Sequence, residues 1–455
     1  MRPVVTADEW RRVEAAHGGD LWLAMDRAGH AVALAAVRAG ASYGRRVVVL
    51  AGPGNNGGDG YVAARYLKRR GVFVVVHALA PSVTELGRRA EDMAQAEGVP
   101  IVELASPVPC DVVIDALFGG GGRSGMPPRV LEWMETNAPV VGVDYPTGLD
   151  PDTGKVAERA FLASETVTFG TLKMGHVRGA GPDHCGVVTV TDIGITGGEP
   201  SMFVAEEVDA PRPTRARASH KWSAGAVLVV GGSHGLAGAA ILAGRAALSF
   251  GAGTVYLATP QVDLMQQVAP EIPALDLDHA EAEIGRFDVV VAGPGLSEDD
   301  AASIRPLLGK AERLVLDAGA LTPATLAAAH QGDAEIVITP HDSEFQRLSG
   351  VGAGAFSIRS LAIRERLSVL RKGNPTMVSD GGPPVMVTTG GPELATIGTG
   401  DVLAGMIAAL WSRGLGPTEA AVSAAYWHGV AGAGLAEQGS VTSDVLADYI
   451  TAFAW

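Results

Sequence analysis

The stretch RVVVLAGPGNNGGDG, residues 46–60, decides the fold of the first half of the chain. Residues 46–51 form a continuous apolar run of the kind found in parallel strands that are buried on both faces. The glycine-rich segment that follows leads into a helical stretch, Tyr61 to Arg70. A strand, a glycine-rich loop and a helix in this order predict a βα unit whose loop can approach a ligand closely.

Similar apolar runs recur further along the chain, separated by segments long enough for crossover helices. They cover residues 72–77, 112–116 and 140–144, and later residues 227–230, 254–258, 289–292, 314–316 and 336–339. This alternation predicts doubly wound α/β sheets. Near the N-terminus, Thr6 and Glu9 predict a capping box that starts a helix, and residues 21–37 predict a second helix.

A domain boundary is expected between the two sets of strands. Residues 197–219 lack hydrophobic periodicity and contain Pro200, Pro211 and Pro213, with three arginines close by. A chain of 455 residues is long enough for two domains at about 100–200 residues each. We therefore expect one α/β domain over residues 1–208 and another over residues 215–455.

Composition narrows the possible partners and the compartment. With 35 basic and 50 acidic residues, the formal charge of −15 argues against binding nucleic acid or an anionic membrane through bulk charge. Two cysteines cannot form a disulfide framework, residues 1–12 lack a signal-like apolar core, and no run of 18 apolar residues occurs. We expect a cytoplasmic protein that acts on a small molecule, and a homo-oligomer.

The glycine-rich loop alone leaves its ligand open. Residues 52–57 match G-x-G-x-x-G, but His77 stands where a standard NAD dehydrogenase carries the acidic residue that binds the ribose. A tight strand–helix connection without a ligand is the plainer alternative. That alternative leaves the polar residues Asn55, Asn56 and Asp59 in the loop unexplained.

Two carboxylates follow neighbouring predicted strands. Asp115 ends one apolar run and Asp144 ends the next. Each could merely cap the following turn. However, the carboxyl ends of parallel strands meet at one edge of a sheet, where such folds bind ligands.

Several motifs of the first half together resemble NAD(P)H-hydrate epimerase. They are GNNGGDG (54–60), DALFGGGG (115–122) and VDYPTGLD (143–150), preceded by AMDRAG (24–29) and followed by FGTLKMG (169–175). The second half resembles the NAD(P)H-hydrate dehydratase of the ribokinase-like superfamily. Its motifs are SHKWSAG (219–225), VVGGSHGLAGAAILAGRAAL (229–248), AGPGL (292–296), TPHDSE (339–344) and GTGDVLAGMIAAL (398–410).

The resemblance implies an N-terminal Rossmann-like three-layer α/β/α domain that epimerises hydrated NAD(P)H, a damaged cofactor. It implies potassium ligands at Asn56, Asp115 and Thr147, which are hard oxygen donors that suit an alkali cation. Thr147 stands where the family usually has serine. The candidate acid–base groups are Asp115, Asp144 and Lys173, although Lys173 could be an ordinary surface lysine. The implied hydrate contacts are Asn55, Asn56, Gly57, Gly58, Asp59, Gly119, Gly120, Gly121, Gly122, Arg123, Ser124, Gly125 and Asp144.

For the second half the resemblance implies a ribokinase-like α/β domain that dehydrates the S hydrate, with ADP as the expected co-substrate, ATP as the alternative, and Mg²⁺. Asp401 follows a Gly-Thr-Gly loop before a helical pattern at 402–411 and is the candidate base for phosphoryl transfer. The plainer alternative is that Asp401 only caps this helix. The implied nucleotide contacts are Lys372, Gly373, Asn374, Pro375, Thr376 and Gly400, and the implied hydrate contacts are Ala252, Gly295, His341 and Asp401.

Two positions depart from the family pattern: Gly319 replaces a usual aspartate, and Ser343 replaces a common glycine. Two other functions stay open at this stage. One is a vitamin-precursor kinase of the same superfamily, and the other is a first domain that binds a nucleotide without catalysis and regulates the second.

Overall fold

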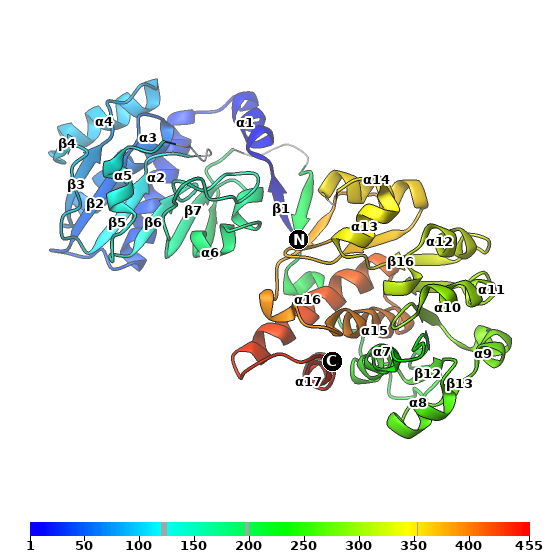
Figure 1. Cartoon of the computed structure of the whole chain (residues 1–455). Helices are drawn as coiled ribbons and strands as arrows, with labels where there is room; N and C mark the ends of the chain where they lie inside the picture. The colour runs from blue at the N-terminus through cyan, green and yellow to red at the C-terminus, as the bar shows by residue number, and fades with distance from the viewer. Residues whose placement is uncertain (120–124, 196–199, 353) are drawn as a thin grey trace. The chain divides into compact units, whose positions relative to one another are not determined.

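The computed structural model describes residues 1–119, 125–195, 200–352 and 354–455 (Figure 1). The chain divides into two compact units, residues 2–201 and residues 202–455, with Met1 assigned to the second. Within the described residues, no helix is both long and apolar enough to cross a membrane.

The N-terminal unit contains a parallel sheet in the order β4-β3-β2-β5-β6-β7-β9. A second parallel pair, β1 (Arg2–Val5) and β8 (Leu172–Lys173), places Val5 opposite Lys173. The strand predicted at 112–116 is confirmed with the same bounds. The strands of the sheet are β2 (Arg46–Ala51), β3 (Phe73–Ala78), β4 (Ile101–Glu103), β5 (Val112–Ala116), β6 (Val140–Val143), β7 (Glu165–Phe169) and β9 (Val187–Thr191).

Helices cover both faces of this sheet. Val47 and Val49 point into the core shared with α2 (Leu21–Arg38), α3 (Asn55–Arg69) and α4 (Glu85–Ala96), whereas Val48 and Leu50 point to the opposite core, which contains α5 (Pro128–Trp133). The predicted three-layer α/β/α architecture is therefore confirmed. The remaining helices are α1 (Ala7–Ala16), which starts with the predicted Thr6–Glu9 capping box, and α6 (Gly181–Cys185).

The glycines after β2 allow the backbone of this loop to pack against neighbouring carbonyl oxygens more closely than any side chain would permit. A Cβ at Gly52 would lie 1.7 Å from the carbonyl oxygen of Leu117, and a Cβ at Gly57 would lie 1.9 Å from the carbonyl oxygen of Gly52. Because these positions are glycine, α3 starts at Asn55, six residues before the helical stretch expected from apolar periodicity. The polar residues of the predicted loop therefore form the first turns of α3, and the N-terminus of this helix lies at the edge of the sheet where the parallel strands end.

The C-terminal unit has its own sheet, in the order β13-β12-β11-β14-β15-β16-β17-β18-β19-β10. Pairing is parallel from β13 to β17 and antiparallel between β17, β18 and β19. The strands are β10 (Met202–Val204), β11 (Ala226–Val230), β12 (Thr254–Ala258), β13 (Ala274–Leu275), β14 (Val289–Ala292), β15 (Arg313–Leu316), β16 (Glu335–Ile338), β17 (Ser368–Arg371), β18 (Thr376–Ser379) and β19 (Val385–Val387).

One face of this second sheet carries an extensive apolar core. Val227, Val229 and Leu257 pack there with α7 (Ala237–Ser249), α15 (Thr399–Ser412), α16 (Pro417–Ala436) and α17 (Ser443–Tyr449). The other helices are α8 (Val262–Val268), α9 (Leu277–Glu283), α10 (Glu298–Ser303), α11 (Arg305–Leu308), α12 (Pro323–Ala329), α13 (Asp342–Ser349) and α14 (Ala355–Glu365).

The segment that joins the two units packs with the second. Strand β10 pairs in parallel with β19, and the carbonyl oxygens of Ala210 and Pro211 accept hydrogen bonds from Trp427 (2.9 Å) and Ser423 (2.8 Å). The structural division therefore falls after Ser201, several residues earlier than the expected end of the first domain at residue 208.

This packing leads to a prediction about independent folding. We expect residues 1–201 and residues 202–455, expressed separately, to be soluble and to melt cooperatively. A fragment 215–455 lacks β10 and leaves the Trp427 indole N–H without its acceptor, so it should be less stable than 202–455, by about 1–3 kcal/mol for that hydrogen bond alone. Urea unfolding of the three fragments measures this. Equal stability of 215–455 and 202–455 would contradict it.

Candidate active sites

A cavity of about 470 Å³ lies at the C-terminal edge of the N-terminal sheet. The loop after β2, the ends of β5 and β6, strand β8 and helix α1 all contribute to its wall. Its lining residues are Ala7, Trp10, Arg11, Glu14, Pro53, Gly54, Asn55, Asn56, Asp59, Val83, Leu117, Phe118, Gly119, Asp144, Tyr145, Phe169 and Lys173.

Asp115 is a fully buried carboxylate next to this cavity. Its Oδ1 accepts a hydrogen bond from the Thr147 hydroxyl (2.8 Å), and its Oδ2 accepts one from the Thr147 backbone N–H (2.6 Å). The Leu117 N–H donates a third bond, at 3.3 Å. Burial raises the pKa of Asp115 to about 6, although these hydrogen bonds oppose the shift. Among the described residues the carboxylate has no cationic partner.

Segment 117–119 connects Asp115 and Thr147 to Asn56. The backbone N–H of Phe118 donates to the Thr147 hydroxyl (3.2 Å), and a Cβ on Gly119 would lie 2.9 Å from Oδ1 of Asn56. The Asn56 amide N–H₂ donates to the carbonyl oxygen of Val143 at 2.9 Å, which turns its Oδ1 away from β6. The three predicted potassium ligands therefore surround one short segment.

Asp144 and Lys173 form a largely buried ion pair that lines the same cavity. Nζ of Lys173 lies 2.7 Å from Oδ1 of Asp144 and also donates to Thr168 (2.7 Å) and to the carbonyl oxygen of Phe169 (3.0 Å). Lys173 is 1% exposed, which excludes the ordinary surface lysine considered above. Burial acts to raise the pKa of Asp144, but the charge and hydrogen bond of Lys173 outweigh it and leave that pKa below its usual value.

The backbone at Asp144 is held in an uncommon conformation. Its φ of 61° lies in the left-handed region, which a non-glycine residue adopts only when its surroundings impose it. His176 is one such restraint: its Nδ1 accepts from the Lys173 N–H (3.2 Å), so its Nε2 carries the proton that is donated to the Asp144 carbonyl oxygen (2.7 Å). Burial lowers the pKa of His176 to about 4, and the ring is neutral at pH 7.

Asp59 is 7% exposed and faces the cavity from α3. Among the described residues it has no hydrogen-bond or ion-pair partner, so its carboxylate is available to a ligand. Burial and the nearby charges of Asp144 and Glu14 raise its pKa well above the usual value. By contrast, His77 packs edge-on against Trp133 (5.5 Å between centroids) away from this cavity and gives no ribose site of the dehydrogenase type.

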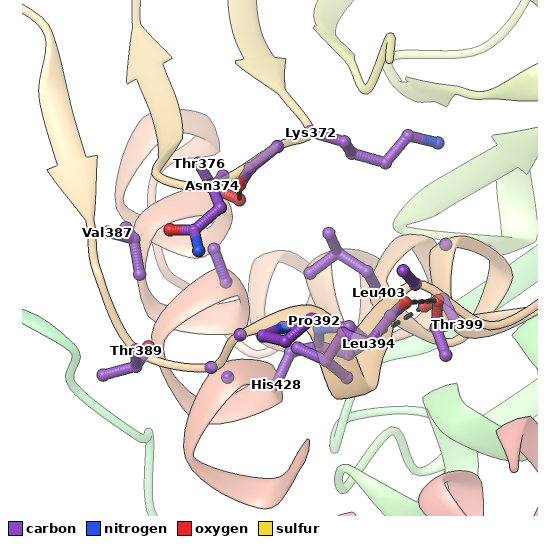
Figure 2. A pocket seen from close by; sticks show the side chains of 17 residues that line it. Lys372, Asn374, Thr376, Val387, Thr389, Pro392, Leu394, Thr399, Leu403 and His428 are labelled. Atoms are coloured by element: carbon purple, nitrogen blue, oxygen red, sulfur yellow. Dashed lines mark hydrogen bonds between the residues drawn. The ribbon is translucent and has the colours of Figure 1, made fainter. Parts of the chain in front are cut away.

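The second site surrounds the N-terminus of α15, beside a pocket of about 330 Å³. Figure 2 shows Asn374, Thr376 and Val387 on one side of this pocket and Pro392, Leu394 and His428 on the other. Of the predicted nucleotide contacts, all but Pro375 line the pocket. The full lining is Lys372, Gly373, Asn374, Thr376, Val387, Thr389, Gly390, Gly391, Pro392, Leu394, Ala395, Thr399, Gly400, Leu403, Ala425, His428 and Gly429.

Asp401 is not the N-cap of its helix. Gly398, with φ 89°, is the N-cap, and Asp401 is the third residue of α15. Burial, followed by the nearby charge of Asp317, raises the pKa of Asp401 to about 7, against an opposing effect of Lys372. A carboxylate with a pKa near the working pH suits general-base catalysis.

Lys372 lies between the first turn of α15 and the end of β15. Its Nζ lies 2.7 Å from Oδ1 of the buried Asp317, and a Cβ on Gly400 would lie only 3.2 Å from the same Nζ. The side chain extends away from Asn374 in Figure 2. Gly400 therefore leaves room for the Lys372 ammonium beside the first turn of α15. The charge of Lys372 lies near enough to the Asp401 carboxylate to lower its pKa.

His341 is the N-cap residue of α13, and it contacts Ser343, one of the two residues that depart from the family pattern. Its Nδ1 lies 3.0 Å from the Ser343 hydroxyl, and its Nε2 lies 3.3 Å from Glu344. Gly319 is the other residue that departs from the pattern. A Cβ at this position would lie 2.3 Å from the carbonyl oxygen of Leu296, which is too close for any side chain. The usual aspartate would not fit at position 319 without a backbone shift.

Gly295 and His341 follow β14 and β16 at the same sheet edge as Asp401, but Ala252 does not. It precedes β12, whose Thr254 pairs with Ala226 at the start of β11, and its carbonyl oxygen accepts a hydrogen bond from Arg215 (3.3 Å). Ala252 thus lies at the opposite edge of this sheet from Asp401, and its role as a hydrate contact stays a prediction. In the first site, Gly120, Gly121, Gly122, Arg123 and Ser124 lie outside the described residues.

Comparison with known proteins agrees with this geometry. Residues 23–175 match the family model described as YjeF-related protein N-terminus, and residues 227–452 match the one described as NAD(P)H-hydrate dehydratase. The bifunctional NAD(P)H-hydrate repair enzyme Nnr of Moorella thermoacetica is 35% identical over 448 residues, covering 87% of this chain and 84% of that protein. The chain belongs to the bifunctional NAD(P)H-hydrate repair enzyme family.

Another member supports the same assignment, and a solved structure shows the fold of the C-terminal unit. The Mycobacterium leprae repair enzyme is 36% identical over 415 residues and covers 88% of this chain and 85% of that protein. A ribokinase-like superfamily protein from Enterococcus faecalis V583 superposes with a TM-score of 0.50 at 23% identity, covering 57% of this chain and 97% of that chain. This superposition and the dehydratase model confirm the ribokinase-like fold of the C-terminal unit.

Among the lining residues that sequence reasoning did not predict are His428 and Trp10. His428 lines the second pocket from α16, where its Nε2 lies 3.0 Å from the Thr399 carbonyl oxygen; burial lowers its pKa to about 4. In the sequence, His428 is a single histidine in an alanine-rich stretch, and nothing else distinguishes it. Trp10 lines the first cavity from α1, and nothing in the sequence distinguishes it from a core aromatic residue of that helix.

Proposed function

We propose that the N-terminal unit interconverts the R and S hydrates of NADH and NADPH, and that the C-terminal unit uses a nucleotide to dehydrate the S hydrate. The observation that carries this proposal is that both halves of the chain match the repair enzymes and that each has its predicted carboxylate at the expected sheet edge, Asp115 fully buried and Asp401 half-buried. The chain would thus return damaged cofactor to NAD(P)H, as a cytoplasmic metabolite-repair enzyme.

For epimerisation, the reactive ring carbon bears a hydroxyl next to the ring nitrogen. Inversion by ring opening breaks and re-forms the bond between this carbon and the ring nitrogen: the hydroxyl gives up its proton as a carbonyl forms, and the ring nitrogen takes the electron pair and a proton. Closure from the other face reverses both proton transfers. Lys173 keeps Asp144 ionised, so Asp144 is the group that accepts the hydroxyl proton in the cavity and returns it. Asp59 has no partner among the described residues and is left to bind the substrate directly.

A potassium ion fits the residues around Asp115. The donor set is a carboxylate, a hydroxyl and an amide oxygen, all hard ligands, and the buried carboxylate has no cationic partner in the described part of the chain. Asn56, Asp115 and Thr147 would hold the ion. When bound, it supplies positive charge beside the hydrate.

We expect potassium to stabilise the epimerase unit. An ion that binds only the folded state adds RT ln(1 + [L]/Kd), about 1.4 kcal/mol at ten times Kd. Thermal unfolding of residues 1–201 at constant ionic strength should therefore show a higher midpoint in KCl than in tetramethylammonium chloride. The midpoint of residues 202–455 serves as the control. Equal midpoints for residues 1–201 in both salts would contradict the ion site.

For dehydration, the S hydrate binds with its ring hydroxyl near Asp401. As Asp401 takes the hydroxyl proton, the oxygen attacks the terminal phosphorus of the nucleotide, and with ADP the leaving group is AMP. The ring nitrogen then donates its electron pair, the carbon–oxygen bond breaks, phosphate leaves and loss of a ring proton restores NAD(P)H. Lys372 through Thr376 and Gly400 would hold the nucleotide, and Mg²⁺, when bound with it, would neutralise phosphate charge.

One incubation tests both activities. Purified protein is mixed with both hydrate epimers, ADP or ATP, Mg²⁺ and K⁺, and the reduced-nicotinamide absorbance is followed. We expect full recovery with release of free phosphate, faster with ADP than with ATP. A stable phosphorylated product without recovered absorbance would instead identify a kinase of the same superfamily.

A further inference from the structure

Helix α1 places one of its faces on the epimerase cavity. Ala7, Trp10, Arg11 and Glu14 recur at helical spacing and all line this cavity, although the matched family segment begins only at residue 23. The N-terminal segment is also fixed to the strand that carries Lys173, because Val5 of β1 lies opposite Lys173 of β8. A segment outside the matched family region therefore contributes to the wall beside the catalytic pair.

Trp10 contacts Lys173 directly. Nζ of Lys173 lies 4.8 Å from the centroid of the Trp10 ring, within the range of a cation–π interaction. Trp10 is 7% exposed, and Gly170 makes room for it, because a Cβ at that position would lie 2.1 Å from the ring. The indole N–H donates to Oε1 of Glu14 at 2.9 Å. This hydrogen bond and the packing at Gly170 hold the ring in place.

From this geometry we infer that Trp10 is a positioning residue of the epimerase, which holds the Lys173 ammonium on Asp144 and keeps water from the pair. The three donors of Lys173 are already used by Asp144, Thr168 and the Phe169 carbonyl oxygen. The aromatic face covers the ammonium without competing for those donors. An aliphatic side chain at position 10 would fill less space and offer no negative face to the ammonium.

The inference rests on the proposed epimerase function, so the test has one arm that needs no activity. Three variants are compared: Trp10→Leu removes the aromatic face, Trp10→Phe keeps it without the N–H, and Glu14→Gln removes the Glu14 charge while keeping an acceptor for the indole. Modification of Lys173 by an amine-acylating reagent is measured by peptide mass spectrometry, with the exposed Lys155 as the internal reference. We expect the Lys173 rate to rise at least about tenfold in Trp10→Leu and to stay near wild type in the other two variants.

The kinetic arm separates positioning from substrate stacking. We expect Trp10→Leu to lower kcat for R-to-S conversion about tenfold or more with KM nearly unchanged, Trp10→Phe to keep most of the activity, and dehydration to be unaffected. A rise in KM alone would assign Trp10 to substrate binding and overturn the inference. Equal losses in Trp10→Phe and Glu14→Gln would also overturn it, because the Trp10–Glu14 hydrogen bond would then carry the effect.

A wild-type chain without epimerase activity would refute the proposed function, whereas unchanged acylation of Lys173 in Trp10→Leu would refute the role of Trp10. The melting midpoint of residues 1–201 shows whether each variant is folded, and dehydratase activity serves as the control for the second unit. If Trp10→Leu unfolds the first unit, Trp10→Met, whose longer and more flexible side chain is still non-aromatic, takes its place with the same expected outcomes.

Discussion

Replacing Asp401 by asparagine is expected to reduce dehydration of the S hydrate by about 10²- to 10⁴-fold, the usual cost of losing a general base. The amide retains the size and much of the hydrogen bonding of the carboxylate but cannot accept the substrate proton at neutral pH. Epimerisation depends on the other unit and should be unchanged. The measurement is recovery of reduced nicotinamide from pure S hydrate with ADP and Mg²⁺. A variant within threefold of wild type would exclude Asp401 as the base.

The same substitution should stabilise the protein above neutral pH. Because the pKa of Asp401 is raised to about 7 in the folded protein, its burial favours the protonated form, and stability is lost as pH rises from about 4 through 7. Asparagine does not ionise, so at pH 8 we expect a gain of about 1–2 kcal/mol, or roughly 2–8 °C in the unfolding midpoint of residues 202–455, that disappears at pH 4. The exposed Asp333→Asn on the same unit is the matched control and should show neither effect.

The pKa of Asp401 also predicts the pH dependence of the wild-type reaction. The carboxylate must be ionised to accept the hydroxyl proton, so kcat/KM for dehydration should fall tenfold per pH unit below about pH 7. Epimerisation should persist to lower pH, because Lys173 holds the pKa of Asp144 below its usual value. Coincident acidic limbs for the two reactions would contradict the separate assignments of Asp401 and Asp144.

Much of the fold could be predicted from the sequence because buried parallel strands are continuous apolar runs. The strands at residues 46–51, 254–258 and 289–292 have the predicted bounds. The start of α3 was missed because Asn55 and its polar neighbours carry no apolar periodicity; the steric need for glycine at positions 52 and 57 fixes that turn instead. Strand β10 was missed because it is short and lies in a proline-containing segment, and only its pairing with β19 defines it.

The candidate site residues divide in the same way, into those in short motifs, which the sequence predicts, and those on helices outside these motifs, which it does not. Residues in strand-end motifs, such as Asp115 and Asp144, were found because parallel topology brings strand ends together. Trp10 and His428 were missed because they reach their cavities from helices distant in sequence, where one aromatic or histidine cannot be distinguished from core packing. Ala252 was assigned by resemblance alone; the strand register puts it at the opposite sheet edge from Asp401, and its role stays a prediction.

The substitution expected to have the largest effect on the first reaction is Asp115→Asn. Alanine would leave the Leu117 N–H and both donors of Thr147 without an acceptor, at about 1–3 kcal/mol each, whereas asparagine keeps one acceptor oxygen. The variant removes the negative charge that would hold potassium, so R-to-S conversion should fall at least about 10²-fold.

The readout is the extent of reaction in a mixed pool of hydrates. With Asp115→Asn, recovery of reduced nicotinamide should stop once the S fraction is used, apart from slow spontaneous epimerisation, and the potassium-dependent rise in melting midpoint should disappear. Thr147→Ser is the matched control: it keeps the hydroxyl that bonds to Asp115 and should behave as wild type. The dehydration rate on pure S hydrate should be unchanged in both variants, because Asp401 and the nucleotide pocket belong to the other unit. Complete consumption of both epimers by Asp115→Asn at the wild-type rate would show that neither the carboxylate nor the ion it is expected to hold contributes to epimerisation.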